Sequence, residues 1–247
     1  MAAVFTPELS AEQVGEFREN GFLALDAITT PDEIAWLTTV YAELLADRRA
    51  LRLRYTASDP SGAARSIEQI FSPELQCPRL LESQYLANAR RLGARLLGCS
   101  LEEASPGGLM MIFKPAGAGR DAPWHQDEAY WDIPRERCHS LSVWMPLDDV
   151  SVESGCMQFI PGSQRNELLP HKKPPGVEPI TVDAPFDLAS AVACPLRAGG
   201  ATIHDCRTLH YTAPNTSPRP RRAFTTIVHG PRTARAVPIA REWLGGA

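Results

Sequence analysis

The sequence predicts a mainly β fold, a sandwich or barrel with helices packed on its outside. Helix signals are confined to the first hundred residues, whereas short β-like runs separated by glycine, proline and aspartate fill the chain from about Gly108 onward. Helices first and strands later, without strict alternation, argue against a doubly wound α/β sheet. Because 247 residues favour one domain, we expect a single domain over 1–247, with mostly helical support in 1–100 and the β core in 108–235.

Two helices are expected near the N-terminus. Ser10 and Gln13 make a capping box for the first helix, and Asn20-Gly21 supplies its stop. The second helix has Thr30 as its N-cap and Pro31 in the first position, where proline is favoured. An apolar stripe further along this helix gives it one face to bury.

A third helix is expected from about Pro78 to Leu97. Five of its leucines are expected to face inward: Leu80, Leu81, Leu86, Leu92 and Leu96. Residues 50–76, between the second and third helices, have weak periodicity and are interpreted as a mobile segment.

The predicted strands follow the third helix. They cover residues 109–114, 140–145, 157–161, 201–205 and 223–229. No GxGxxG follows a predicted strand and no Walker loop is present, so nucleotide binding lacks support.

Composition and charge exclude several classes of partner. The net charge is −4, from 25 basic and 29 acidic residues, which leaves no electrostatic footprint for nucleic acid or an anionic membrane. No apolar run approaches the roughly 18 residues of a transmembrane helix, and Met1–Ser10 lacks the features of a signal peptide. The six cysteines contain no CxxC pair, so we expect reduced thiols and a cytoplasmic protein.

The most informative segment is Pro123-Trp124-His125-Gln126-Asp127. His125 and Asp127 are two residues apart, so in an extended strand both side chains leave the same face. An imidazole nitrogen and a carboxylate oxygen can bind one divalent ion there, and one more histidine would complete the 2-His-1-carboxylate facial triad of non-haem iron(II) enzymes. Alone, His-x-Asp is a weak signal, because chance matches are common.

The third ligand has to be a distant histidine. The candidates are His139, His171, His204, His210 and His229. His210 stands out because it follows a predicted strand and because Arg221 comes eleven residues later, where the next strand opens. This order would bring a metal and a guanidinium to the same end of a barrel, and the planar fork of arginine pairs bidentately with a carboxylate. Arg219 and Arg222 compete with Arg221 for that role.

Four motifs follow one another along the chain: Leu9–Phe22, Pro123–Asp127, Val143–Ser163 and His210–Arg222. In this order they resemble the phytanoyl-CoA dioxygenase family of iron(II)- and 2-oxoglutarate-dependent oxygenases, across nearly the whole chain. The four together are a far stronger signal than any one of them. Gln164 departs from the family pattern, where a histidine commonly follows Gly-Ser, at a position outside the metal site.

The resemblance implies a double-stranded β-helix, a cupin-like jelly-roll barrel with flanking helices, that uses Fe(II), 2-oxoglutarate and O2. Carried over to this chain, His125, Asp127 and His210 are the catalytic residues that hold the iron. Arg221 is the residue that binds the distal carboxylate of 2-oxoglutarate.

Two further residues are candidates for binding 2-oxoglutarate. Trp144 stands where the family often lines the co-substrate pocket, with plain core packing as the alternative, and Lys114 lies on the strand before the metal motif. Of the aromatic residues near that motif, Trp124, Tyr130 and Trp131 either contact substrate or wall the site.

The reaction implied is hydroxylation, or a related oxidation such as ring closure, of a small molecule. Halogenases of this superfamily replace the carboxylate ligand with a small residue, whereas Asp127 is present here. Bacterial members of the family often tailor secondary metabolites, so antibiotic biosynthesis is favoured. The substrate pocket is expected from residues 50–76, 115–122 and 163–192, the least motif-like parts of the chain.

Three alternatives stay open at this point. The first is an acyl-CoA or amino-acid hydroxylase of primary metabolism. The second is a non-redox cupin-like metal protein, which would not need an arginine after the distal histidine. The third is an inactive binding module, which should have lost at least one member of the triad.

Overall fold

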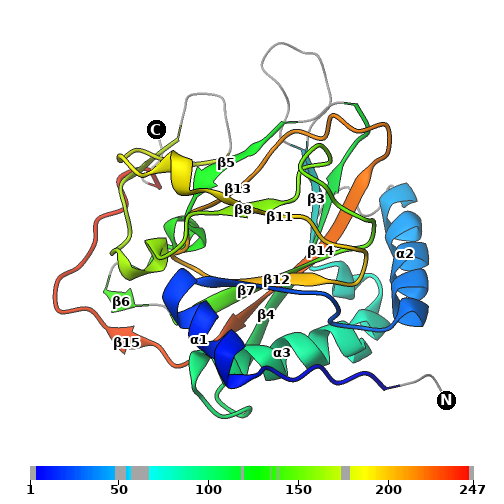
Figure 1. The fold of residues 1–247 in the computed structure, drawn as a ribbon, viewed down its shortest axis with the longest axis horizontal. Coiled ribbons are helices and arrows are strands. Elements are labelled where there is room, and N and C mark those ends of the chain that lie inside the picture. Colours follow the sequence, from blue (N-terminus) through cyan, green and yellow to red (C-terminus); the bar gives the residue numbers. More distant parts are fainter. Residues whose placement is uncertain are drawn as a thin grey trace.

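Two antiparallel β-sheets face each other in this computed structural model (Figure 1). The structure describes residues 4–47, 54–56, 67–117, 120–133, 135–137, 139–173 and 179–244. Within these residues, a seven-stranded major sheet has the order β1-β12-β7-β14-β4-β3-β2, and a four-stranded minor sheet has the order β11-β8-β13-β5. Three α-helices of the described chain pack against the major sheet. The predicted fold class, a jelly roll with flanking helices, is confirmed.

The strands of the two sheets come from all parts of the chain. The major sheet contains β1 (Phe22–Leu25), β12 (Ala201–Asp205), β7 (Ser140–Pro146), β14 (Arg221–His229), β4 (Ser105–Lys114), β3 (Glu68–Phe71) and β2 (Arg54–Thr56). The minor sheet contains β11 (Val192–Cys194), β8 (Met157–Phe159), β13 (His210–Thr212) and β5 (Ala122–His125). Two small pairs lie apart, β9 (His171–Lys172) with β10 (Thr181–Val182), and β6 (Glu136–Arg137) with β15 (Thr233–Ala234). All five predicted strand runs overlap observed strands.

The first two helices lie where the capping residues predict them. The capping box of Ser10 and Gln13 opens α1 (Ala11–Asn20), which ends at a left-handed glycine. The Thr30 hydroxyl accepts a hydrogen bond from Glu33 N at 3.2 Å and opens α2 (Pro31–Ala46).

The third predicted helix is interrupted, which corrects the expectation of one helix from Pro78 to Leu97. A 3-10 turn, η3 (Pro78–Glu82), precedes α3 (Gln84–Leu97), and Ser83 between them has extended backbone. Leu81 lies on the 3-10 turn and is 62% exposed, so the expectation that it faces inward is wrong. The leucines that are buried as predicted are Leu80, Leu92 and Leu96.

A tertiary contact explains where α3 begins. The buried carboxylate of Glu33, in α2, accepts hydrogen bonds from Gln84 N at 2.7 Å and Tyr85 N at 2.8 Å. These are two of the N–H groups that a helix start leaves without an intrahelical partner. Ser83 also caps the helix locally, because its hydroxyl accepts a hydrogen bond from Leu86 N at 3.3 Å. The carboxylate of Glu33 adds a tertiary contact at the same boundary that no local sequence pattern encodes.

The first hundred residues also contribute three strands to the major sheet, which the sequence did not predict. β1 pairs with β12, from Phe22 opposite His204 to Leu25 opposite Ala201. Within the segment that was interpreted as mobile, residues 50–53 and 57–66 lie outside the described residues, whereas β3 is hydrogen-bonded to β4.

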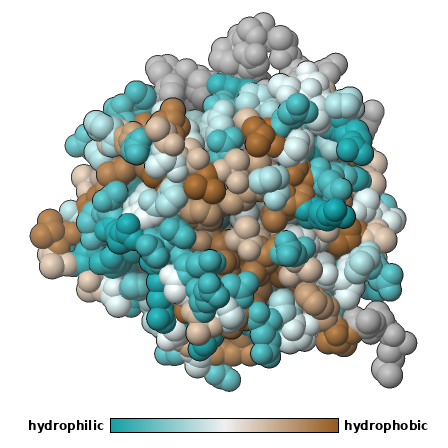
Figure 2. All heavy atoms as spheres, in the orientation of Figure 1, coloured by the Kyte–Doolittle hydropathy of each residue, from teal (hydrophilic) through white to brown (hydrophobic). Residues whose placement is uncertain are grey.

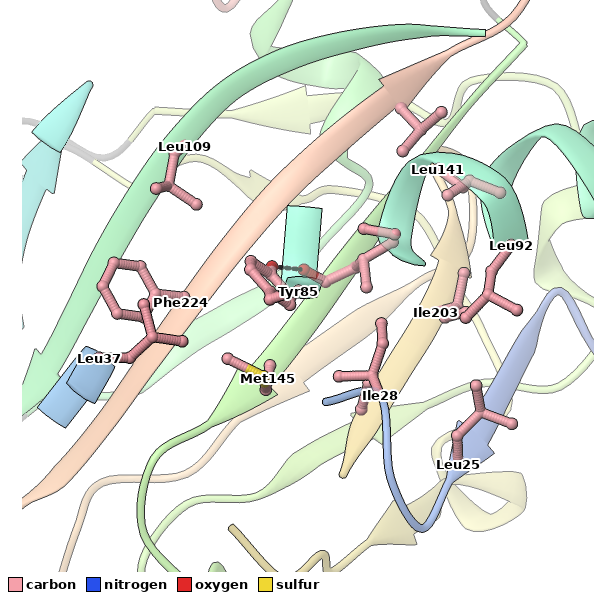
Figure 3. Close-up of a cluster of buried hydrophobic side chains, with 14 of the residues drawn as sticks. Leu25, Ile28, Leu37, Tyr85, Leu92, Leu109, Leu141, Met145, Ile203 and Phe224 are labelled. Atoms are coloured by element: carbon pink, nitrogen blue, oxygen red, sulfur yellow. Dashed lines mark hydrogen bonds between the residues drawn. The ribbon is translucent and has the colours of Figure 1, made fainter. Parts of the chain in front are cut away.

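The main hydrophobic core lies between the major sheet and the helices (Figure 3). Tyr85 of α3 donates a hydrogen bond to Val143 O at 2.6 Å, and Tyr41 of α2 meets the Phe224 ring edge-on at 5.6 Å between centroids. Side chains alternate between the two faces of a strand, so the residues next to Val143 and Phe224 point away from the helices and toward the minor sheet. Trp144 is one of them and packs in the second core, between the sheets.

The surface in the orientation of Figure 1 is mixed. Hydrophilic residues dominate its rim, and hydrophobic residues gather toward the middle, between the two sheets (Figure 2). Among the described residues, no helix is both long enough and apolar enough to cross a bilayer. No disulfide joins any of the five described cysteines, and Cys138 lies outside the described residues.

Candidate active site

Two of the predicted metal ligands lie opposite each other in the minor sheet. His125 ends β5, His210 begins β13, and the two are direct cross-strand partners with ring centroids 4.1 Å apart. Asp127 follows two residues after His125 and opens a 3-10 turn, η4 (Asp127–Tyr130). Antiparallel pairing of two short strands thus brings together residues that are far apart in the sequence.

The ligand atoms of these three residues converge. One side-chain ligand atom from each of His125, Asp127 and His210 lies within 4.8 Å of the other two. Among the described residues, this is the one group of three or more His, Cys, Asp or Glu side chains that converge so closely. Asp127 Oδ1 is 3.6 Å from His125 Nε2 and 3.4 Å from His210 Nε2. Of the five histidines considered as the third ligand, His210 therefore has the required position.

Backbone carbonyl groups orient both imidazole rings. His125 Nδ1 lies 2.6 Å from Pro123 O, and His210 Nδ1 lies 2.9 Å from Thr208 O. A carbonyl oxygen can only accept, so Nδ1 carries the hydrogen and the Nε2 lone pair is left for a metal. Contacts of this kind fix the tautomer and orientation of metal-binding histidines.

The surroundings favour a neutral imidazole and an ionised carboxylate. Burial, followed by the proximity of His210, lowers the pKa of His125. Burial alone would raise the pKa of Asp127, but the histidines around the carboxylate hold this pKa well below its usual range. Because metal ligands must be deprotonated, both shifts prepare the site for a cation.

Gln126, between the two ligands of the motif, ties the metal loop to its neighbours. Its fully buried side chain donates to Arg207 O at 2.7 Å and accepts from Leu169 N at 2.8 Å. Its own N–H donates to His171 Nε2 at 3.1 Å, and His171 Nδ1 lies 2.8 Å from Leu169 O. The sequence marked neither Gln126 nor His171 for this role.

Arg221 lies on the inner face of the major sheet, at the start of β14. The residue is 1% exposed, and its Nε and Nη1 have no hydrogen-bond partner among the described residues. Its Cζ lies 5.4 Å from the centre of the Trp144 ring. Burial lowers the pKa of the guanidinium to about 10, so it remains charged at neutral pH. A buried cation with unused donors requires an anion, because uncompensated buried charge is costly.

The structure separates Arg221 from its two competitors. Arg222 leaves the opposite face of the strand and binds Asp148 twice, Nε to Oδ2 at 3.0 Å and Nη2 to Oδ1 at 2.6 Å. Arg219 precedes the strand and is exposed. Of the three arginines, Arg221 combines burial with unused donors.

Lys114 pairs with Arg221 across β4 and β14, but its ammonium group is already engaged. Nζ donates to Thr212 O at 3.0 Å, Thr212 Oγ1 at 2.7 Å and Ala213 O at 2.6 Å. These acceptors match the three N–H donors of an ammonium group. Burial, with a smaller contribution from Arg221, holds the pKa of Lys114 well below its usual range. Lys114 thus braces the strand that carries His210, and its binding of 2-oxoglutarate stays a prediction.

The aromatic residues near the metal motif have different surroundings. Trp124 precedes a metal ligand in β5, so its side chain leaves the opposite face and joins an aromatic cluster there. Trp131 packs edge-on to His229, at 5.9 Å between centroids. Tyr130 meets the His125 ring edge-on at 5.5 Å and is 42% exposed. Tyr130 is therefore the one of the three that combines contact with a predicted metal ligand and access to solvent.

The donors present fit an iron(II) centre and its co-substrate. Two imidazole nitrogens and one carboxylate oxygen are the facial triad of non-haem iron(II) oxygenases. The unused donors of Arg221, on the facing sheet, fit a carboxylate.

Comparison with known proteins agrees with this geometry. The profile of the phytanoyl-CoA dioxygenase (PhyH) family matches residues 17–223. An ectoine dioxygenase from Bordetella parapertussis is 29% identical over 238 residues, which cover 88% of this chain and 74% of the relative.

Solved structures extend the likeness to the whole fold. EvdO2 from Micromonospora carbonacea var. aurantiaca, complexed with 2-oxoglutarate, has a TM-score of 0.83 at 34% identity, covering 98% of this chain and 99% of its own. The α-ketoglutarate-dependent carbocyclase SnoK from nogalamycin biosynthesis shares the fold, with a TM-score of 0.71 at 23% identity over 92% of this chain and 87% of its own. The chain belongs to the phytanoyl-CoA dioxygenase family and is an iron(II)- and 2-oxoglutarate-dependent dioxygenase.

Proposed function

We propose that the protein hydroxylates or oxidatively cyclises a small molecule, with His125, Asp127 and His210 as the ligands of Fe(II). Arg221 binds the distal carboxylate of 2-oxoglutarate, and Trp144 lines the pocket beside it. One observation carries this proposal. A converging His–Asp–His set on the minor sheet faces a buried arginine with unused donors on the major sheet.

The bound iron supplies the activation of O2, with 2-oxoglutarate as the source of electrons. The residues of the chain supply position and charge. His125 and His210 present their Nε2 lone pairs because both Nδ1 atoms are engaged by carbonyl groups. Asp127 contributes a negative charge that partly offsets the charge of the cation, and its presence occupies the position that a halide would need.

Apolar side chains lie beside Arg221 between the sheets. Trp144 is 3% exposed and packs with Phe159 and Ala223 in the core between the sheets. In such surroundings, the attraction between Arg221 and a carboxylate is less screened than in water. The guanidinium would hold one carboxylate of 2-oxoglutarate, and the other end of the co-substrate would be left for the iron that His125, Asp127 and His210 would hold.

The substrate class is proposed from the relatives. SnoK, which shares the fold, is from nogalamycin biosynthesis, and another relative is an ectoine dioxygenase. Both support a small-molecule substrate, and the first supports bacterial secondary metabolism, specifically antibiotic biosynthesis, which we prefer. We place the reaction in the cytoplasm, in keeping with described cysteines that form no disulfide.

Succinate formation from 2-oxoglutarate tests the reaction. We expect slow, Fe(II)-dependent succinate release without substrate and a faster, coupled release with the correct substrate. A panel that includes ectoine and biosynthetic precursors of nogalamycin separates the two substrate classes. Failure to form succinate by a protein that binds iron would contradict the proposal.

A further inference from the structure

Asp127 is approached from both sheets. Its Oδ1 faces the two ligand histidines of the minor sheet, as described above. Its Oδ2 faces the major sheet, where Ser142 Oγ donates to it at 2.5 Å and His204 Nε2 lies 3.3 Å away. Ser142 and His204 are direct cross-strand partners in β7 and β12. Two neighbouring strands of the major sheet thus converge on one oxygen of a residue that follows β5 of the minor sheet.

His204 has no other polar contact in the described structure. The residue is 2% exposed, and neither ring nitrogen makes a hydrogen bond of standard geometry with a described residue, so the 3.3 Å approach of Nε2 to Asp127 Oδ2 is its nearest polar contact. Its ring lies among aromatic groups, 5.2 Å from the Phe159 ring and 4.4 Å from the His210 ring between centroids. Burying a polar group without a partner costs about 1–3 kcal/mol, so a native protein that retains one requires an explanation. Asp127 Oδ2 is the acceptor within reach.

We propose that His204 and Ser142 are positioning residues that hold Asp127 Oδ2, so that the carboxylate binds the metal through Oδ1 alone. A carboxylate whose second oxygen accepts a hydrogen bond from Ser142 and lies against His204 Nε2 is hindered from rotating to chelate the metal with both oxygens. The coordination positions that the co-substrate and O2 need therefore stay open. This inference rests on the proposed ligand set, and it assigns to His204 a role that the sequence did not indicate.

The chain contains a matched control for this pair. His229 of β14 faces Ser140 of the same β7, and His229 Nδ1 lies 2.8 Å from Ser140 Oγ. Both pairs join a histidine and a serine across neighbouring strands of the major sheet. They differ in that one reaches a proposed metal ligand and the other does not.

Mn(II) binding to the metal-free protein, followed by the electron paramagnetic resonance signal of the free ion, tests the proposal. We expect His204→Leu and Ser142→Ala each to weaken Mn(II) binding by about 10–100-fold, the usual effect of removing a partner of a metal ligand. In the double variant, the fold-loss of Mn(II) affinity should be smaller than the product of the fold-losses in the two single variants, because both residues act on one oxygen. His204→Gln retains an N–H donor and should keep most of the affinity, and His229→Leu should keep all of it.

The outcomes are distinguishable. Unchanged Mn(II) affinity in His204→Leu and Ser142→Ala, with normal affinity in the unsubstituted protein, overturns the positioning role. So does an equal loss in His229→Leu, because it would indicate a general effect on the sheet. Absence of Mn(II) binding in the unsubstituted protein instead overturns the ligand set. The KM for 2-oxoglutarate should also rise in His204→Leu and Ser142→Ala, because a carboxylate that is free to rotate can take a position that the co-substrate needs, and it should stay unchanged in His229→Leu. If His204→Leu does not fold, Ser142→Ala tests the proposal instead. Ser142→Thr keeps the hydroxyl donor and should therefore restore the Mn(II) affinity.

Discussion

The major and minor sheets present their functional residues from strands of different length. Arg221 begins β14, which pairs with β4 through eight registered residues and with β7, the strand of Trp144, through seven. His125 and His210 lie on minor-sheet strands of four and three residues. The short strands are supplemented by side-chain contacts, such as those of Gln126 with its neighbours.

This difference has a physical reason. A long ladder of backbone hydrogen bonds fixes a strand without help from side chains, so the major sheet can hold a buried cation in place. Three or four residues give too few ladder bonds to do this, and a metal site loses function when its ligands are loosely supported. We therefore expect substitutions in the major sheet to change what is bound, and substitutions around the minor sheet also to loosen the site.

The largest expected effect is that of Asp127→Ala, which removes a ligand of the minor-sheet site. Turnover should fall by more than about a thousandfold, equivalent to a barrier raised by about 4 kcal/mol. The fold should survive, because neither the backbone ladders of the major sheet nor the main hydrophobic core depends on this side chain. Succinate release measures the first effect and circular dichroism the second. The exposed carboxylate of Asp32, in α2, supplies a control variant that should keep full turnover. Normal turnover in Asp127→Ala would show that the metal assignment is wrong.

Arg221→Ala tests the major-sheet side of the comparison. We expect the KM for 2-oxoglutarate to rise about a hundredfold, or ~3 kcal/mol, because a carboxylate loses a buried bidentate partner. Mn(II) affinity should stay unchanged, because the ladder of β14 does not depend on the guanidinium. Arg222→Ala is the matched control: it breaks the contact with Asp148 and should leave the KM unchanged. An equal rise in KM for both variants would remove the distinction between the two arginines.

The sequence predicts those parts of this site that obey a spacing rule. His125 and Asp127 are two residues apart, so their side chains are expected on the same face of a strand. The order of the motifs along the chain then indicated His210 as the third ligand and Arg221 as the co-substrate residue. The resemblance favoured Arg221 over Arg219 and Arg222, but the physical reason for that choice needed the structure, since it depends on which residue begins β14. Arg221 and Ala223 leave the inner face of this strand, and Arg222 leaves the outer one.

Contacts between distant segments could not be predicted. The approach of His204 to Asp127 and that of His171 to Gln126 each join residues without a common motif or period. The start of α3 has this origin only in part, because a carboxylate in α2 accepts from its first N–H groups while Ser83 supplies a local cap. Local rules therefore predicted the capped helices and the metal motif, and failed where tertiary hydrogen bonds determine the structure.

Gln126→Leu tests whether side-chain contacts hold the minor-sheet site together. The substitution leaves Leu169 N–H and Arg207 C=O without a partner, so the free energy of unfolding should fall by about 2–3 kcal/mol. Mn(II) binding should weaken as well. Gln164→Leu is the control: Gln164 is also buried and donates to Arg18 O and Glu19 O, away from the metal. We expect it to lose stability in urea denaturation without a change in Mn(II) affinity. Equal Mn(II) affinity in both variants would contradict the role of the Gln126 hydrogen bonds in holding the metal site together.

The smallest effect is a pH dependence from His171, which contacts the metal loop through Gln126 N. Burial lowers the pKa of His171 from 6.5 to about 4. Between these values the unfolded chain binds one more proton than the folded chain, so the stability contributed by the neutral ring is lost as the pH falls below 6.5 and levels off near 4.

At pH 5.5 this loss should be about 1 kcal/mol, because one pKa unit corresponds to about 1.4 kcal/mol. Urea denaturation of the metal-free protein at pH 7.5 and pH 5.5, compared with His171→Phe, isolates the contribution of this ring. The difference in unfolding free energy between the two proteins should shrink by about 1 kcal/mol at the lower pH. A difference that does not change with pH would mean that His171 is free to protonate in the folded state. In that case the contact with Gln126 would not be one of the side-chain supports that distinguish the minor sheet from the major sheet.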